Sequence, residues 1–146
     1  MKIKVIYDSK YEWLKIPSTF ISPTQKVYSF IVVDTGSPNT LLNYFDSRKL
    51  NIPFINKSGI VSIGGNKYVS YSYENLKILF KSTEGKPIIE KIPVKILRPS
   101  SSKIAEIEDL DVFPNILGLD FLKKYKFSCD LKNNEIFLEK MENEHI

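Results

Sequence analysis

An acid, a hydroxyl residue and a glycine follow one another at Asp34, Thr35 and Gly36, directly after the apolar run 30–33. A continuous apolar run of this kind indicates a strand that is buried on both faces. A carboxylate at the end of such a strand is costly unless it is paired or hydrogen-bonded, and Gly36 allows a tight turn whose amide can donate to it. Thr35 adds a hydroxyl that can bond locally or across an interface. The stretch therefore predicts one rigidly held acid at the mouth of a strand.

The segment 115–122 has the sequence Asn-Ile-Leu-Gly-Leu-Asp-Phe-Leu, which predicts an apolar strand that ends in a glycine before a short helix. Taken alone, the Asp-Thr-Gly at 34–36 is also typical of a strand that ends in an Asx turn. Together the two segments resemble the retropepsin-like aspartic proteases. In that family a Val-Asp-Thr-Gly-Ser/Ala loop lies beside an Ile-Leu-Gly-x-Asp-Phe-Leu segment. The resemblance extends over roughly residues 30–139, which is most of the chain.

The resemblance implies an aspartic endopeptidase in which Asp34 is the catalytic residue. Such an enzyme needs two carboxyl groups, one ionised to take a proton from water and one protonated to polarise the scissile carbonyl. This chain has a single Asp-Thr-Gly and is much shorter than a two-lobed pepsin-like enzyme. The second acid must then come from a second copy, so the resemblance implies a homodimer with Asp34 beside its symmetry mate and a peptide or protein as substrate.

The resemblance also assigns roles around this acid. Three residues would support the active-site loop (Thr35, Gly36 and Ser37), and three would form the scaffold behind it (Ile116, Leu117 and Gly118). The tip of a mobile hairpin, or flap, that closes over a bound peptide would be formed by Ile63, Gly64 and Gly65. A plain hairpin turn is the alternative for these three residues. We interpret Asp120 as a helix-start residue and not as a third catalytic acid.

The length of 146 residues and the hydrophobic content of 42% fit one globular domain with its own core. We expect a single domain over 1–141 and a C-terminal tail over 142–146. Residues 1–8 alternate Lys with Ile and Val, which is typical of a strand and not of a signal peptide. The sequence has no membrane-spanning stretch, and the single cysteine, Cys129, lacks an internal disulfide partner. These features predict a cytoplasmic protein without membrane contact.

Composition limits the chemistry that is open to the chain. The only histidine is His145, so a histidine-based catalytic triad and a zinc site of His and Cys ligands lack their parts. A glycine-rich phosphate-binding loop followed by Lys and Ser or Thr is also missing from the sequence. We therefore expect no metal and no other cofactor, and we assign the chemistry of an enzyme to carboxylates.

Two other functions remain as alternatives. A lysine-rich β-barrel that binds nucleic acid has only the net charge of +4 in its favour. Arg48 and Arg98 are the only arginines, the residue favoured for gripping bases and phosphates, so we expect no nucleic-acid partner. The other alternative is a catalytically inactive dimerisation or peptide-binding module on the same fold. The intact Asp-Thr-Gly argues against it, because a buried acid pair is costly to retain without use.

Strands separated by short turns dominate the predicted secondary structure. We expect strands at 2–7, 11–16 (ended by Pro17), 27–34 and 40–42, and then either a helix over 44–50 capped by Asn43 or an irregular loop. Further along we expect a hairpin of 58–63 and 66–80 with a bulge near Glu74 and Asn75, a strand at 88–97, a loop at 98–111, a strand at 112–117, a helix at 119–125 and a hairpin of 127–131 and 135–139. The pattern predicts an all-β domain of barrel type with one or two short helices. The closed β-barrel that the retropepsin-like resemblance implies agrees with it.

Overall fold

The computed structural model describes residues 1–63, 65–100 and 113–141. Its strands are β1 (Lys2–Lys4), β2 (Ile6–Asp8), β3 (Trp13–Ile21), β4 (Lys26–Val33), β5 (Leu41–Leu42), β6 (Lys57–Ile63), β7 (Asn66–Lys81), β8 (Pro87–Pro99), β9 (Asn115–Leu117), β10 (Tyr125–Asp130) and β11 (Glu135–Lys140). The helices in these residues are α1 (Tyr44–Lys49) and α2 (Leu119–Leu122). The predicted all-β class with one or two short helices is confirmed. Gly64, most of the predicted loop 98–111 and the predicted tail 142–146 lie outside the described residues.

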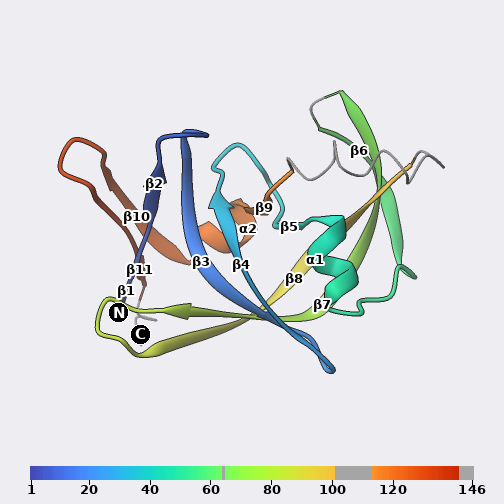
Figure 1. Cartoon of the computed structure of the whole chain (residues 1–146), viewed down its shortest axis with the longest axis horizontal. Coiled ribbons are helices and arrows are strands. Elements are labelled where there is room, and N and C mark those ends of the chain that lie inside the picture. Colours follow the sequence, from blue (N-terminus) through green and yellow to red (C-terminus); the bar gives the residue numbers. More distant parts are fainter. Residues whose placement is uncertain (64, 101–112, 142–146) are drawn as a thin grey trace, which may run out of the picture.

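The larger sheet of the described chain has the strand order β2-β3-β4-β9-β5-β8-β7-β6, and β3 also pairs with β7. This extra pairing joins β3, β4, β9, β5, β8 and β7 into a ring of strands (Figure 1). The described strands thus form a ring, and the closed barrel that was expected from the sequence is not assigned to them. Within the ring β4 and β9 are parallel neighbours, and Val33 lies opposite Leu117. Their ladder places the residues that follow the two strands, Asp34 and Gly118, at the same end of the ring.

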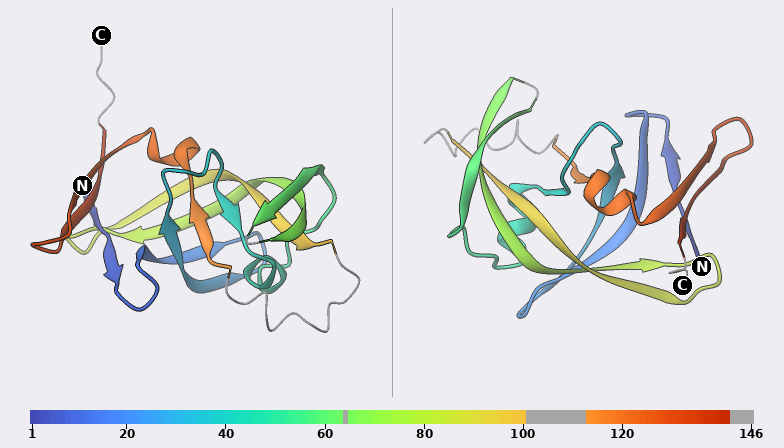
Figure 2. Two further views of the ribbon diagram at one scale, coloured as in Figure 1. Left: turned by 90° about the horizontal axis from the view of Figure 1, so that it is seen from above. Right: turned by 180° about the vertical axis from the view of Figure 1, so that it is seen from behind.

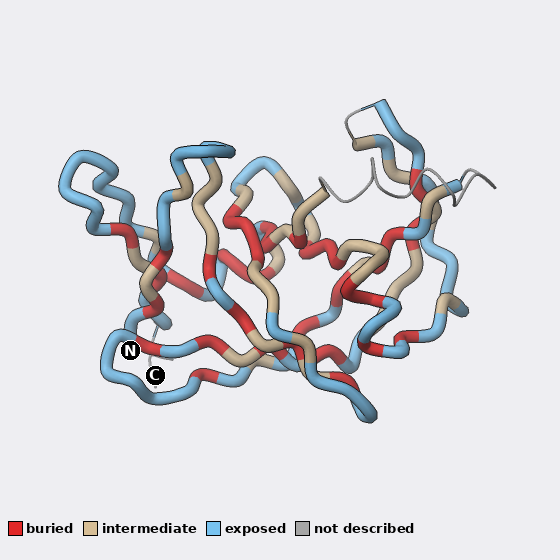
Figure 3. The backbone as a smooth tube through the Cα atoms, in the orientation of Figure 1, coloured by how far each residue is buried: buried red, intermediate tan, exposed pale blue. Residues whose placement is uncertain are grey.

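The main core consists of apolar side chains from nearly every strand of the ring. Along β7, the alternating residues Leu76, Ile78 and Phe80 are all fully buried, as the period of a strand with one face in the core requires. The buried positions are concentrated in the middle of the strands, and the hairpin tips are exposed (Figure 3). The core therefore fixes the strands, and the loops that extend from them are free to carry function.

The predicted bulge in the long hairpin strand is confirmed. The pairing of β7 with β8 shifts register between Tyr73, which lies opposite Val94, and Leu76, which lies opposite Ile92. The extra residue reverses which face of β7 points inward, because side chains alternate along a strand. As a result Leu76 is buried in the core, whereas Glu74, two residues before it, is exposed.

The first predicted strand, 2–7, is in fact two strands in two sheets. β1 pairs with β11, β2 pairs with β3, and Val5 lies between them. The backbone N–H of Val5 donates to the carbonyl of Ile136 at 2.9 Å, and its side chain is fully buried. The chain changes sheet at this residue, a change that alternation of apolar residues cannot reveal.

The prediction that Pro17 ends the second strand is wrong, because β3 continues through it to Ile21. Along β3, residues 13–15 pair with β2 and residues 19–21 pair with β7, and Pro17 lies between these two partners. Opposite it on β4 is Phe30. Proline lacks an N–H, so it fits at a position where one side of the strand has no pairing.

Of the two helices, α1 agrees with the sequence and α2 is shorter than predicted. The side chain of Asn43 accepts a hydrogen bond from the N–H of Asp46 at 2.8 Å, which confirms Asn43 as the N-cap of α1. The predicted helix 119–125 ends at Leu122, because Tyr125 already pairs with Lys140 in a sheet. The second sheet of the described chain, in the order β1-β11-β10, contains the predicted last hairpin.

Candidate active site

Asp34 follows β4 directly and is held by its backbone on both sides. Its N–H donates to the carbonyl of Leu117 at 3.0 Å, and its carbonyl accepts from the N–H of Ser37 at 3.2 Å. The carboxylate oxygen Oδ1 accepts from the N–H of Gly36 at 2.8 Å. The side chain is half-buried, so the acid is fixed in place and still reachable from solvent. This matches the rigidly held acid that the sequence predicts.

The rest of the Asp-Thr-Gly turn faces solvent in the single chain. Thr35 and Gly36 are both exposed. A Cβ on Gly36 would lie 3.2 Å from Oδ1 of Asp34, so a larger residue would crowd the carboxylate that this turn positions. The turn thus presents one carboxylate, one hydroxyl and bare backbone on the surface.

Gly118 is where the two motifs meet most closely. A Cβ on this residue would lie 2.3 Å from the carbonyl oxygen of Asn39, a distance that real Cβ atoms do not reach. Next to it, the N–H of Leu119 donates to the carbonyl of Ser37 at 2.8 Å. The hydroxyl of Ser37 in turn donates to the carbonyl of Asn39 at 2.7 Å. The glycine permits backbone-to-backbone contact between the start of α2 and the loop after Asp34.

Asp120 makes a second connection between the motifs, through its side chain. Its Oδ1 accepts from the hydroxyl of Thr40 at 2.7 Å, and its Oδ2 accepts from the N–H of Thr40 at 3.1 Å. It also accepts from the N–H of Phe121 at 2.8 Å in the first turn of α2. The helix-start position predicted for Asp120 agrees with this geometry, and the acid additionally ties α2 to the residue that precedes β5.

The predicted scaffold residues Ile116 and Leu117 lie on opposite faces of β9. Leu117 is fully buried in the main core. Ile116 instead packs against a second cluster, whose buried members are Leu41, Tyr68 and Leu97. Leu117 therefore points into the main core, whereas Ile116 faces the β6–β7 hairpin, and the scaffold role of these residues stays a prediction.

The β6–β7 hairpin contributes to the second cluster from both arms. Val61 and Ile63 from β6 pack against it, and Tyr68 from β7 is buried within it. Burial raises the pKa of the Tyr68 hydroxyl, and its ring lies 5.7 Å from that of Phe113. At the tip, Gly65 has φ +80, a conformation that side-chain-bearing residues rarely adopt. Of the predicted flap residues, Ile63 and Gly65 thus lie at the tip of a real hairpin, and Gly64 is outside the described residues.

A buried polar network, which the sequence motifs do not reveal, lies behind the site. The Oδ2 atom of Asp46, on α1, accepts from Ser29 Oγ at 2.9 Å and from Asn115 Nδ2 at 2.6 Å. Asn115 Oδ1 accepts from the N–H of Asn43 at 2.8 Å, and both Asp46 and Asn115 are buried. The network ties α1 to β4 and β9, the two strands that end at the site. The available signal was Asn115 itself, a polar residue directly before the apolar part of the second motif.

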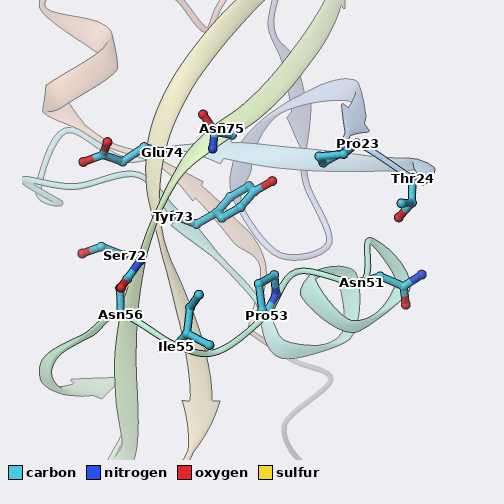
Figure 4. A pocket seen from close by; sticks show the side chains of 10 residues that line it. All are labelled: Pro23, Thr24, Asn51, Pro53, Ile55, Asn56, Ser72, Tyr73, Glu74 and Asn75. Atoms are coloured by element: carbon cyan, nitrogen blue, oxygen red, sulfur yellow. The ribbon is translucent and has the colours of Figure 1, made fainter.

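Three pockets lie on the described surface, and one of them is lined by Asn39, Thr40 and Asp120 of the candidate site. One of about 580 Å³ lies between the β3–β4 turn, the segment after α1 and the bulge of β7, and the side chain of Tyr73 lies in its centre (Figure 4). Two others have volumes of about 270 and 550 Å³. Asp34 lines none of these three pockets. Among the described residues, no group of three or more His, Cys, Asp or Glu side chains is placed to hold a metal ion.

The helices of the described residues are too short and too polar for any of them to span a membrane.

Comparison with curated proteins finds a relative of retroviral type. Over 130 residues the chain is 28% identical to the Retrovirus-related Pol polyprotein from transposon 412 of Drosophila melanogaster. The alignment covers 89% of this chain but only 9% of the polyprotein. No family model matches the sequence.

Comparison with solved structures identifies the fold. A retropepsin-like aspartic protease from Rickettsia conorii superimposes with a TM-score of 0.55 at 18% identity, covering 94% of this chain and 90% of that one. The retroviral protease-like domain of Ddi1 from Leishmania major gives a TM-score of 0.53 at 16% identity, covering 92% and 98%. The resemblance predicted from the two motifs is confirmed: the chain has the fold of the retropepsin-like aspartic proteases.

Proposed function

We propose that this chain is an aspartic endopeptidase that hydrolyses peptide bonds as a homodimer, with Asp34 as the catalytic residue of each copy. The observation that carries the proposal is the position and hydrogen bonding of the Asp34 carboxylate. Its carboxylate is half-buried at the end of β4, and the N–H of Gly36 fixes one oxygen at 2.8 Å. A fixed carboxylate that stays accessible to water is what general acid–base catalysis on a peptide requires.

The dimer follows from the number of acids and from where Asp34 lies. One chain supplies one Asp-Thr-Gly, and the exposed surface of that turn includes Thr35 and Gly36. A two-fold axis at the turn would bring two Asp34 carboxylates together and cover these exposed residues. The relatives named above are of protease type, which supports the same assignment.

In the dimer the two Asp34 carboxyl groups would share one proton, because two carboxylates held close together cannot both ionise. The ionised one takes a proton from the attacking water, and the protonated one donates a hydrogen bond to the scissile carbonyl. We assign the reacting water to Oδ2 of Asp34, since Oδ1 already accepts from Gly36. The β6–β7 hairpin, with its glycine at φ +80, would close over the peptide.

The test is cleavage of a peptide library at acidic and neutral pH by the wild type and by Asp34→Asn. We expect the variant to lose cleavage by several orders of magnitude and to keep the melting temperature and the sedimentation of the wild type. Glu84→Gln, at the exposed β7–β8 turn, is the matched control and should retain activity. The wild type should be inhibited by pepstatin and give a bell-shaped pH profile.

Full cleavage by Asp34→Asn would overturn the aspartic mechanism. A dimeric wild type that binds peptides and cleaves none would instead support the alternative, a catalytically inactive dimerisation or peptide-binding module.

A further inference from the structure

Four strands meet where the β3–β4 hairpin crosses the β7–β8 hairpin, and their outward side chains form rows across the sheet. β3 pairs with β4 on one side and with β7 on the other, and β7 pairs with β8. The strand order over this part of the ring is therefore β4-β3-β7-β8. In Figure 1 and in the right-hand view of Figure 2 the crossing lies in the lower part of the molecule, whereas the loop between β4 and β5, which carries Asp34, lies in the upper part.

One outward row is apolar apart from a threonine. Thr19 lies opposite Tyr28 on β4 and opposite Leu79 on β7. Leu79 in turn lies opposite Ile89 on β8. The two ends of the row are exposed, Tyr28 by 83% and Ile89 by 56%, and the two middle residues are half-buried. With neighbouring strands about 4.8 Å apart, the row is about 14 Å long.

The next outward row is basic. Ile21 lies opposite Lys26 on β4 and opposite Lys77 on β7. Lys77 lies directly opposite Lys91 on β8, an arrangement of like charges that opposes strand pairing. All three lysines are exposed, and none of them takes part in the ion pairs formed within residues 1–63, 65–100 and 113–141. The row therefore presents three positive charges to solvent, next to the apolar row.

The acidic residues of these four strands lie away from the two rows. β3 and β4 contain no acidic residue. On β8, the carboxylate of Glu90 accepts from Lys140 and Tyr125 of the smaller sheet. On β7, Glu74 lies before the bulge. The outward side is thus positively charged with an apolar row across it, and we call the two rows the lysine face (Lys26, Ile21, Lys77 and Lys91 with Tyr28, Thr19, Leu79 and Ile89).

We propose that the lysine face is a docking surface for an acidic segment of a protein partner, a segment that carries apolar side chains among its carboxylates. The carboxylates pair with Lys26, Lys77 and Lys91, and the apolar side chains cover Tyr28 and Ile89. Binding also relieves the repulsion between Lys77 and Lys91, because carboxylates placed between them attract both.

The composition of the lysine face favours a protein segment over a nucleic acid or a lipid surface. The face contains no arginine, the residue that binds phosphate by two parallel hydrogen bonds, and it offers a single aromatic ring, Tyr28, on which a base could stack. A segment that lies along the apolar row contacts Thr19 and Leu79 as well as the exposed ends. A flat lipid surface would contact mainly the ends.

The lysine face is separate from the candidate active site. Tyr28 lies six residues before Asp34 on the same extended strand, which corresponds to about 20 Å. A bound segment therefore leaves the carboxylate of Asp34 and the turn at the proposed dimer axis uncovered. Each copy of the chain has its own lysine face, so docking requires neither the dimer nor cleavage.

The first experiment measures the binding of a fluorescein-labelled peptide of Glu and Leu by fluorescence anisotropy, in the wild type and in Asp34→Asn, which should leave the peptide intact. The double variant Lys77→Gln/Lys91→Gln should weaken binding by about tenfold at low salt, because two attractive charges are lost. Its melting temperature should equal or exceed that of the wild type, because a like-charge pair is removed. The matched control Lys10→Gln/Lys132→Gln removes the same charge from two exposed turns and should bind as the wild type does.

The second experiment tests the apolar row. Tyr28→Ser/Ile89→Thr should weaken the binding of the Glu and Leu peptide, because exposed apolar surface that the leucines cover is removed. The same variant should bind a peptide of Glu and Ser as the wild type does. Equal effects on the two peptides would show that the apolar row is not part of the docking surface and would overturn the proposal.

The remaining outcomes identify the partner and separate docking from the proposed function. An equal loss of binding in the Lys10/Lys132 control would show attraction by net charge alone and overturn the proposal. Tighter binding of a single-stranded oligonucleotide or of phosphatidylserine vesicles, lost in the Lys77/Lys91 variant, would overturn the assignment to an acidic protein segment. Cleavage does not enter any of these measurements, so a wild type without protease activity would leave docking intact, and a failure of docking would leave the protease assignment intact.

Discussion

The carboxylate of Asp120 holds Thr40 by both of its oxygens, one bonded to the hydroxyl at 2.7 Å and the other to the backbone N–H at 3.1 Å. The same hydroxyl accepts from the N–H of Gly118 at 3.2 Å. Thr40 is fully buried, so these groups have little access to water that could replace a lost partner. The contact keeps the loop after Asp34 against the start of α2.

Replacing Thr40 by Val should lower the free energy of unfolding by about 1–3 kcal/mol, because a carboxylate oxygen and an N–H lose their partner in a buried setting. Thr40→Ser keeps the hydroxyl and is the matched control. We expect it to lose less than half as much. Urea denaturation of the three proteins measures the difference, and equal losses in both variants would show that the hydroxyl contributes nothing.

A pair of glycines at the two ends of β7 allows strain and function to be separated. Gly65 at the β6–β7 tip has φ +80, Gly85 in the β7–β8 turn has φ +81, and an added Cβ meets no atom within 4 Å at either. Val at either position should cost about 1–2 kcal/mol of stability, because the left-handed conformation is unfavourable for a β-branched residue.

If the β6–β7 hairpin closes over the substrate, only Gly65→Val should also lower peptide turnover, by tenfold or more. Gly85→Val is then the control for strain alone. Comparable turnover by the two variants would favour a plain hairpin turn at Gly65.

Stability at acidic pH should depend on Glu90, which connects β8 to the smaller sheet. Its Oε1 accepts from Lys140 Nζ at 2.8 Å and from the hydroxyl of Tyr125 at 2.9 Å. Burial by itself raises the pKa of the Glu90 carboxyl, but the hydrogen bonds from Lys140 and Tyr125 outweigh burial and lower it below its ordinary value of 4.5. The folded state therefore favours the ionised form, and this contribution is present above pH 4.5 and lost as the pH falls through the lowered pKa.

We expect Glu90→Gln to be less stable than the wild type at neutral pH, with the difference shrinking as the pH falls below 4.5. Denaturant unfolding at a series of pH values measures this difference. A gap that stays constant down to pH 2 would contradict the assignment.

Local signals in the sequence predicted the parts of the fold that depend on neighbouring residues. The N-cap of α1 follows from the chemistry of Asn43, and the bulge of β7 follows from the change in parity between Tyr73 and Leu76. The position of Asp34 follows similarly, because an apolar strand followed by Asp-Thr-Gly specifies its own turn.

Features that depend on distant partners could not be predicted in this way. Pro17 is tolerated because two different strands flank it on β3, and α2 ends early because Tyr125 joins a sheet with Lys140. The hydrogen bond between Asp46 and Asn115 joins α1 to β9, and no residue near either of them in the sequence indicates this contact. In each case the deciding contact forms only when the tertiary structure does.

The pairing of β1 with β11 has a consequence for the order in which the chain folds. Lys2 lies opposite Glu139, so β1 cannot pair until β11, which follows it across almost the whole of this sequence, has been synthesised. Closing so long a loop costs conformational entropy before any favourable contact forms. We therefore expect the pairing of β1 with β11 to form late and slowly. Ile3 and Val5, both fully buried in the finished fold, remain without their partners until β11 has left the ribosome.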